Sequence, residues 1–210
     1  MNRYTVILKK LLLCFCAAGA NYLLAGLLGH FKVPLFMDTL FTLTVTFIAG
    51  PLYGCLTAAL TVLAFQLLND EYLLSALYFF CSGSGVILAA FFSRSHHLAE
   101  NEKPGSFNIL TMLLILSLEM CLVISITGGL IARFILLLDP VSGTFLVPHN
   151  YYFLGLLLNH VPLPVAEIVS RIPVNIPDRL LSVYGGYGIA VLLKNSRIFG
   201  VTNPEVPGGC

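Results

Sequence analysis

Charged residues and tryptophan are what this sequence most plainly lacks. Only 10% of its 210 residues are charged and none is tryptophan, whereas 58% are hydrophobic. A soluble domain has about 25% charged residues, so the shortage of charge excludes an ordinary soluble domain. The positive and negative charges nearly cancel, because the sequence has 11 Lys and Arg residues and 10 Asp and Glu residues. This balance gives no sign of a nucleic-acid partner.

The sequence also lacks the signatures of several catalytic classes. It contains no GxxxxGKS/T phosphate loop, no HExxH, no GxSxG and no CxxC, which excludes the chemistry that depends on those motifs. Five of the six cysteines lie in apolar stretches, where Cys behaves as a small hydrophobic residue. A metal site at His96 and His97 would need further ligands. We therefore predict no metal, no cofactor and no enzymatic activity, leaving an intramembrane enzyme as an alternative.

What the sequence does contain is a series of apolar runs. Several approach or exceed the roughly 20 residues that cross a bilayer as a helix, and the mean hydropathy is +0.91. They predict an all-α polytopic membrane protein, a single domain over residues 1–210, with about six transmembrane helices. The first run is longer than the apolar region of a signal peptide, so we expect it to remain uncleaved. The predicted spans are 7–29, 39–49, 52–68, 72–92, 107–138 and 179–193.

The region between the fifth and sixth spans has a different character. It holds two short apolar pieces, YYFLGLLLN (151–159) and LPVAEIVSRI (163–172), among several prolines. Neither piece is long enough to cross a bilayer. We predict two short helices that lie at the membrane interface or re-enter it and line a cavity. A surface hairpin that packs on the helix ends is the alternative.

Basic residues are unevenly distributed between the predicted loops. By the positive-inside rule, the side with more Lys and Arg in its short loops is cytoplasmic. With about six spans, both termini share a side. We therefore predict a multi-pass protein of the cell membrane with both termini in the cytoplasm. The basic residues on that side are Arg3, Lys9, Lys10, Arg94, Lys103, Lys194 and Arg197.

Polar residues at membrane depth are the remaining functional signal. Charged groups there are costly, so they usually face a cavity or a partner. Polar pairs between helices are the general alternative. For Arg133 and Arg179 we expect snorkelling to the interface, and for Asp38 and Asp178 helix capping competes with ligand binding. The polar set comprises Asn21, Asp38, Gln66, Asn69, Glu119, Arg133, Asp178 and Arg179.

One long stretch carries a resemblance to a known family. PLFMDTLFTLTVTFIAGPLYGCLTAALTVLAF resembles the substrate-binding S components of energy-coupling factor (ECF) transporters, with Asp38-Thr39, a short second span, Gly50-Pro51 and Gly54 in order. TGGL (127–130) and IPVNIPDRLLSVYGGYGIA are similar to the family's fifth and last helices. Phe41 departs from the pattern, because related chains often carry Gly there.

The resemblance implies a function as well as a fold. It implies a six-helix membrane protein that binds a vitamin or similar micronutrient near the outer face, beneath the loop that joins the first two spans. It also implies a transmembrane coupling subunit and two cytosolic ATPases as partners. A transmembrane sensory input module of a signalling protein is the alternative. A channel or self-contained carrier is disfavoured, because the sequence shows no inverted repeat.

We expect the ligand site at the outer face, between that loop and the openings of the fifth and sixth spans. Under the predicted topology, most of the candidate residues lie at or near the outer ends of the spans. A small polar ligand needs a few fixed donors and acceptors in an apolar pocket, which such residues would supply. The candidates are Asp38, Thr39, Asn69, Tyr78, Arg133, Asn159, Asn175 and Asp178.

Small residues on the first span suggest a partner-docking surface. Cys16 and Ala20 form a small-xxx-small pair, and Ala17 lies beside them. Small side chains let helices approach closely in lipid. Packing against a neighbouring span of the same chain is the alternative.

Overall fold

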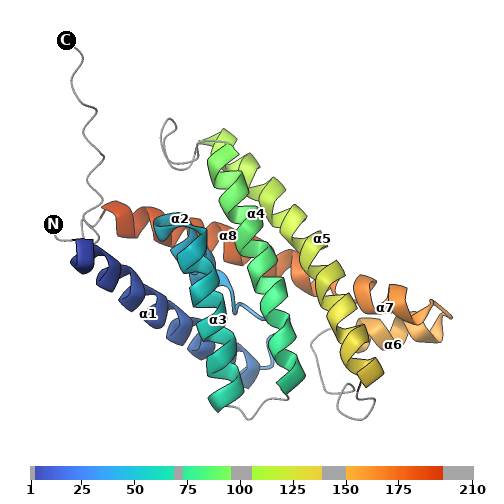
Figure 1. Ribbon diagram of the computed structural model, residues 1–210. Coiled ribbons are helices and arrows are strands. Elements are labelled where there is room, and N and C mark those ends of the chain that lie inside the picture. The colour runs from blue at the N-terminus through green and yellow to red at the C-terminus, as the bar shows by residue number, and fades with distance from the viewer. Residues whose placement is uncertain (1–2, 69–72, 96–105, 139–149, 196–210) are drawn as a thin grey trace.

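A computed structural model describes residues 3–68, 73–95, 106–138 and 150–195, and every regular element in these ranges is helical (Figure 1). This confirms the predicted all-helical class. The elements are α1 (Arg3–His30), α2 (Leu40–Ala49), α3 (Pro51–Leu68), the 3₁₀-helix η1 (Leu73–Tyr78), α4 (Phe79–Ser95), α5 (Phe107–Leu138), α6 (Asn150–Leu158), α7 (Leu163–Val169) and α8 (Ile172–Asn195).

Four helical stretches are long and apolar enough to cross a membrane. They match the first, third, fourth and fifth predicted spans, so the chain has the character of a multi-pass membrane protein. Helix α2 has only 10 residues, about 15 Å. The count of about six spans therefore stays a prediction. The four stretches are Tyr4–His30, Pro51–Leu68, Leu73–Arg94 and Phe107–Leu138.

The last helix begins earlier than the sequence pattern indicates. Helix α8 starts at Ile172 rather than near Arg179, and it contains Pro177. Its first N–H groups have no intrahelical acceptor, so Pro173 is tolerated in the first turn. Pro177 lies further along the helix. It has no backbone N–H, so the Pro173 carbonyl lacks its usual hydrogen-bond donor from residue 177. Asp178 and Arg179 consequently lie inside α8, not at its opening.

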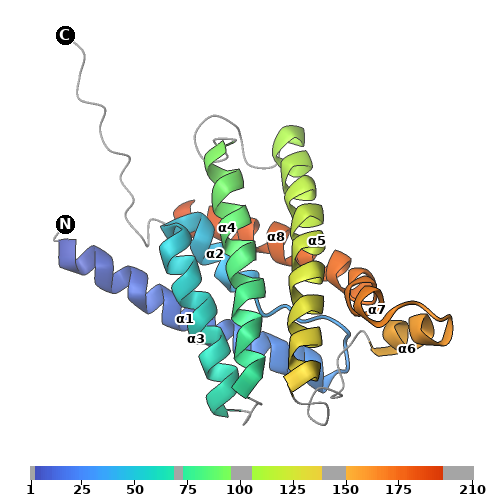
Figure 2. The same cartoon turned by 45° about the vertical axis from the view of Figure 1, so that its right-hand side comes forward.

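Helix α2 lies at the centre of the helix arrangement. It contacts α1, α3, α4 and α8, and 6 of its 10 residues are buried. In both views α3, α4 and α5 stand side by side while α8 crosses behind them at a steep angle (Figures 1 and 2). Helix α7 packs on α5, and α6 packs on α7. The beginning of α1 and the end of α8 lie toward the same end of the molecule.

Two glycines allow the close packing of α2. A Cβ at Gly54 of α3 would collide with Thr46 Oγ1, and one at Gly186 of α8 would lie 3.0 Å from the Leu40 carbonyl oxygen. Gly50, between α2 and α3, has φ = 92°, a conformation that favours glycine. The Gly-Pro-x-x-Gly motif thus supplies both the turn and the contact between these helices.

Asn21 of α1 joins the first three helices. Its side chain is fully buried, and its Nδ2 donates to Thr42 Oγ1 (2.9 Å) and Thr61 Oγ1 (3.2 Å). Its Oδ1 accepts the Phe41 backbone N–H at 3.0 Å. A buried amide with three partners specifies the register between helices. Asn21 therefore satisfies a free N–H in the first turn of α2, a task the sequence suggested for Asp38.

Candidate functional site

A buried group of charges lies where the loop between α1 and α2 meets α8. Arg179 is 3% exposed. Its Nη1 donates to Thr39 Oγ1 at 2.6 Å, and its Nη2 is hydrogen-bonded to Asp178 Oδ2. The same Nη2 lies 3.7 Å from Asp38 Oδ1. Snorkelling was therefore the wrong expectation for Arg179, because two carboxylates and a hydroxyl hold it inside the protein.

Asp178 ties the loop to the last helix. Its side chain is fully buried, and its Oδ1 accepts the backbone N–H groups of Phe36 (3.0 Å) and Met37 (2.8 Å). Met37 has φ = 47°, a left-handed conformation that is uncommon for residues with a Cβ. One carboxylate thus binds two backbone donors and one guanidinium. We call residues 31–39 the tethered loop.

A second buried arginine lies at the junction of α7 and α8. Arg171 is 7% exposed, and its Nη2 donates to the Tyr78 hydroxyl at 3.3 Å. Its guanidinium also lies 5.7 Å from the centre of the Tyr78 ring, within the range of a cation–π interaction. A Cβ on Gly128 would lie 3.2 Å from Arg171 Nη1. The first glycine of TGGL therefore leaves room for this arginine.

The second glycine of TGGL has a different neighbour. A Cβ on Gly129 would lie 2.6 Å from Ile168 Cγ1 and 3.0 Å from its Cα, so α7 rests directly on α5. Glu167 is buried there. Burial raises the pKa of the Glu167 carboxyl, although the positive charges of Arg171 and Arg133 act in the opposite direction.

Further polar contacts connect α8 and α4 to α5. Asn175 Nδ2 donates to Ser125 Oγ at 2.9 Å in a buried contact. Thr127 Oγ1 lies 3.5 Å from Cys81 Sγ. These contacts and the two arginines are buried polar interactions between helices of an otherwise apolar bundle. Across the described ranges no three His, Cys, Asp or Glu side chains gather as a metal site would require.

The structure brings together part of the predicted ligand-site set. Asp38, Thr39 and Asp178 surround Arg179, Tyr78 contacts Arg171, and Asn175 lies on α8 one turn before Arg179.

Two of the other three predicted ligand-site residues, Arg133 and Asn159, lie away from this cluster. Arg133 is half-buried on α5. Asn159 is exposed, and its Nδ2 donates to the Gly155 carbonyl at 2.8 Å, closing the end of α6. Asn69 lies outside the described residues.

Sequence reasoning missed the two central arginines as site residues. Arg171 was not singled out, and Arg179 was assigned to the interface. A usable signal was the Asp-Arg pair itself, because a cation beside a carboxylate in an apolar segment indicates a buried pair. In the described residues, Arg171 and Arg179 each keep a buried Nε without a hydrogen-bond acceptor.

The predicted docking residues on α1 divide between two faces. Cys16 is exposed and Ala20 is half-buried. Ala17 is only 6% exposed and packs with Cys14 and Val45 in a small apolar cluster. Ala17 therefore takes part in packing within the chain, as the alternative proposed, whereas Cys16 faces outward.

Comparison of the chain with models of known families, with curated proteins and with solved structures gave no match in any of the three. The fold and site thus define an all-helical protein with four helices long and apolar enough to cross a membrane and with a buried cluster of charged and polar side chains.

Proposed function

We propose that this chain is the membrane substrate-binding subunit of an uptake system for a vitamin or similar micronutrient. A separate module, made of a transmembrane coupling subunit and two cytosolic ATPases, supplies the energy. The chain lies in the cell membrane with both termini in the cytoplasm. The motif order from Asp38 to Gly54 supports this proposal, since it resembles that of ECF S components.

The single observation that carries the proposal is the tethered loop. Phe36 and Met37 are held by Asp178, and Thr39 by Arg179. These few polar contacts join the loop to buried side chains of α8. A ligand with matching donors and acceptors can replace them. Loops on a rigid scaffold are common binding elements. In this account the loop opens to admit the ligand and closes over it.

The side chains of the buried polar cluster indicate which ligand groups fit. The buried Nε–H groups of Arg171 and Arg179 would donate to carbonyl or acidic oxygens. The Tyr78 ring offers an apolar face, although Arg171 already lies over it. Asp38 is the least buried charge of the group, with its side chain 36% exposed, and would accept from a donor or cation on the ligand.

The function is tested by identifying what the protein binds and what drives its transport. Mass spectrometry of small molecules extracted from the purified protein should show one heterocyclic micronutrient at close to one molecule per chain. Co-reconstitution with a coupling subunit and two ATPases should then give ATP-dependent uptake of that molecule into liposomes. If ligand binding instead changes the activity of a kinase or cyclase joined to the chain, the sensory alternative is correct.

A further inference from the structure

Glu119 differs from Asp178 and Arg179, the paired charges of the buried site. It lies on α5, a 32-residue helix from Phe107 to Leu138. Any stretch of about 20 residues chosen from α5 to cross the membrane includes Glu119. Its side chain is exposed, and among the described residues it makes no hydrogen bond or ion pair. Asp178 and Arg179, in contrast, are buried and paired.

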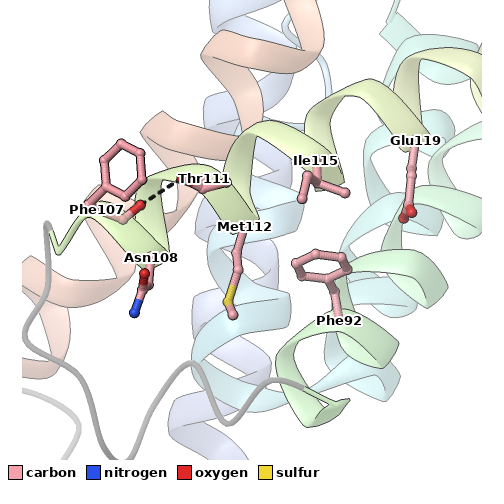
Figure 3. A pocket seen from close by; sticks show the side chains of 7 residues that line it. All are labelled: Phe92, Phe107, Asn108, Thr111, Met112, Ile115 and Glu119. Atoms are coloured by element: carbon pink, nitrogen blue, oxygen red, sulfur yellow. Dashed lines mark hydrogen bonds between the residues drawn. The ribbon is translucent and has the colours of Figure 1, made fainter.

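The surroundings of Glu119 form an open groove between α4 and α5. The groove has a volume of about 400 Å³. Figure 3 shows Phe92 of α4 facing Ile115 and Met112 of α5, with Glu119 at one end and Phe107 at the other. The lining residues are Phe92, Phe107, Asn108, Thr111, Met112, Ile115 and Glu119.

The spacing of the lining residues suits a helix as the occupant. Asn108, Met112, Ile115 and Glu119 recur every three or four positions, which places them on one stripe of α5. Packing a ridge of side chains into such a stripe is how two helices associate at a shallow angle. A groove that ends in a carboxylate also gives the occupant a defined register, because one polar contact fixes the position along the helix.

Charge decides between the candidate occupants. Lipid alone would leave the carboxylate without a partner at membrane depth, which is costly. A second copy, meeting the groove by two-fold symmetry, would bring two Glu119 carboxylates to the same depth, and like charges at close range repel each other. A helix with a Lys or Arg at the matching depth satisfies the carboxylate directly.

We propose that the groove between α4 and α5 is a docking surface for a transmembrane helix of a partner protein, and that a basic side chain of this helix pairs with Glu119. The surface is separate from the Cys16 face of α1. The proposal depends on the placement of α5 in a membrane and is independent of the ligand site beneath the tethered loop.

The test uses the full chain in phosphatidylcholine liposomes and three synthetic helices. One is a Leu/Ala transmembrane helix with a single Arg at its middle; the other two carry Leu or Glu at that position. Energy transfer from labelled peptide to labelled protein reports association. The Arg helix should bind about tenfold more tightly than the Leu helix, and the Glu helix no better than the Leu helix.

Variants of the chain locate the contact. Glu119→Leu should remove the preference for the Arg helix, whereas Leu130→Ala, at an exposed position further along α5, should keep it. A photo-crosslinking amino acid in place of Ile115 should capture the Arg helix. Equal binding of the three helices, or a preference that survives Glu119→Leu, would overturn the proposal. Crosslinks between two copies of the chain from position 115 would show that the occupant is a second copy, which also overturns it.

Discussion

At Arg179, two carboxylates and a hydroxyl surround a guanidinium that is 3% exposed. A buried charge is tolerated when its partners neutralise it and satisfy its donors. Asp178 contributes most, because it also accepts two backbone N–H groups from the tethered loop. At the residue scale, the stability of the loop and that of the buried charge therefore depend on the same carboxylate.

Asp178→Asn keeps the size of the side chain and removes its charge. Among the described residues, Asp38, 3.7 Å away, is then the one carboxylate that still faces Arg179, which also keeps its hydrogen bond to Thr39. Breaking a buried pair in this way costs about 3–5 kcal/mol, so we expect a loss of stability in that range, measured by denaturant titration in detergent.

The control for this variant is Leu181→Ala, which alters an exposed side chain of the same helix and should change stability by less than about 0.5 kcal/mol. Adding Arg179→Met to Asp178→Asn should restore part of the loss, because the unpaired charge is removed as well. Parent-like stability of Asp178→Asn would show that the pair is unimportant.

At the element scale, the structure depends on how closely helices approach α2. Gly186 faces Leu40, Leu43 and Thr44 of α2, with the Leu40 carbonyl oxygen 3.0 Å from an added Cβ. Gly188, on the same helix, has no atom within 4 Å of its added Cβ. Gly186 and Gly188, two of the three glycines of α8, thus form a matched pair, in which only Gly186 permits a helix contact.

Gly186→Ala should push α8 away from α2 and destabilise the protein by about 1–3 kcal/mol. Gly188→Ala should leave stability unchanged or increase it by up to about 1 kcal/mol, because alanine favours the helix. Thermal unfolding of both variants in the same detergent measures the difference. Equal midpoints for the two variants would mean that α8 does not pack on α2 through Gly186.

The apolar runs predicted the long helices well, because length and hydropathy alone determine which segments cross a bilayer. The short α2 was also anticipated, since Gly50 and Pro51 end it. The start of α8 was missed because Pro173 and Pro177 resemble turn signals. The acidic members of the site were predicted, whereas their partnership with Arg179 was not. Arg179 and Thr39 are 140 positions apart, and only the packing of α2 against α8 brings them together.

At the scale of the whole molecule, orientation in the membrane is the first question. The beginning of α1 and the end of α8 lie toward the same end in both views, and the basic loops predict that this end faces the cytoplasm. In Asn101→Cys, a membrane-impermeant maleimide should label the new cysteine in inside-out vesicles and not in intact cells. The parent chain controls for native cysteines. Labelling from outside alone would contradict the predicted orientation.

The central claim is that a small ligand binds beneath the tethered loop and contacts Asp38. The direct measurement is a calorimetric titration of the parent and of Asp38→Asn with the micronutrient identified from the purified protein. A hydrogen bond to a charged group contributes about 1.5–3 kcal/mol, so the affinity of Asp38→Asn should fall by at least about tenfold. Leu181→Ala, at an exposed position of α8, should bind like the parent. Unchanged affinity in a normally folded Asp38→Asn would contradict the claim.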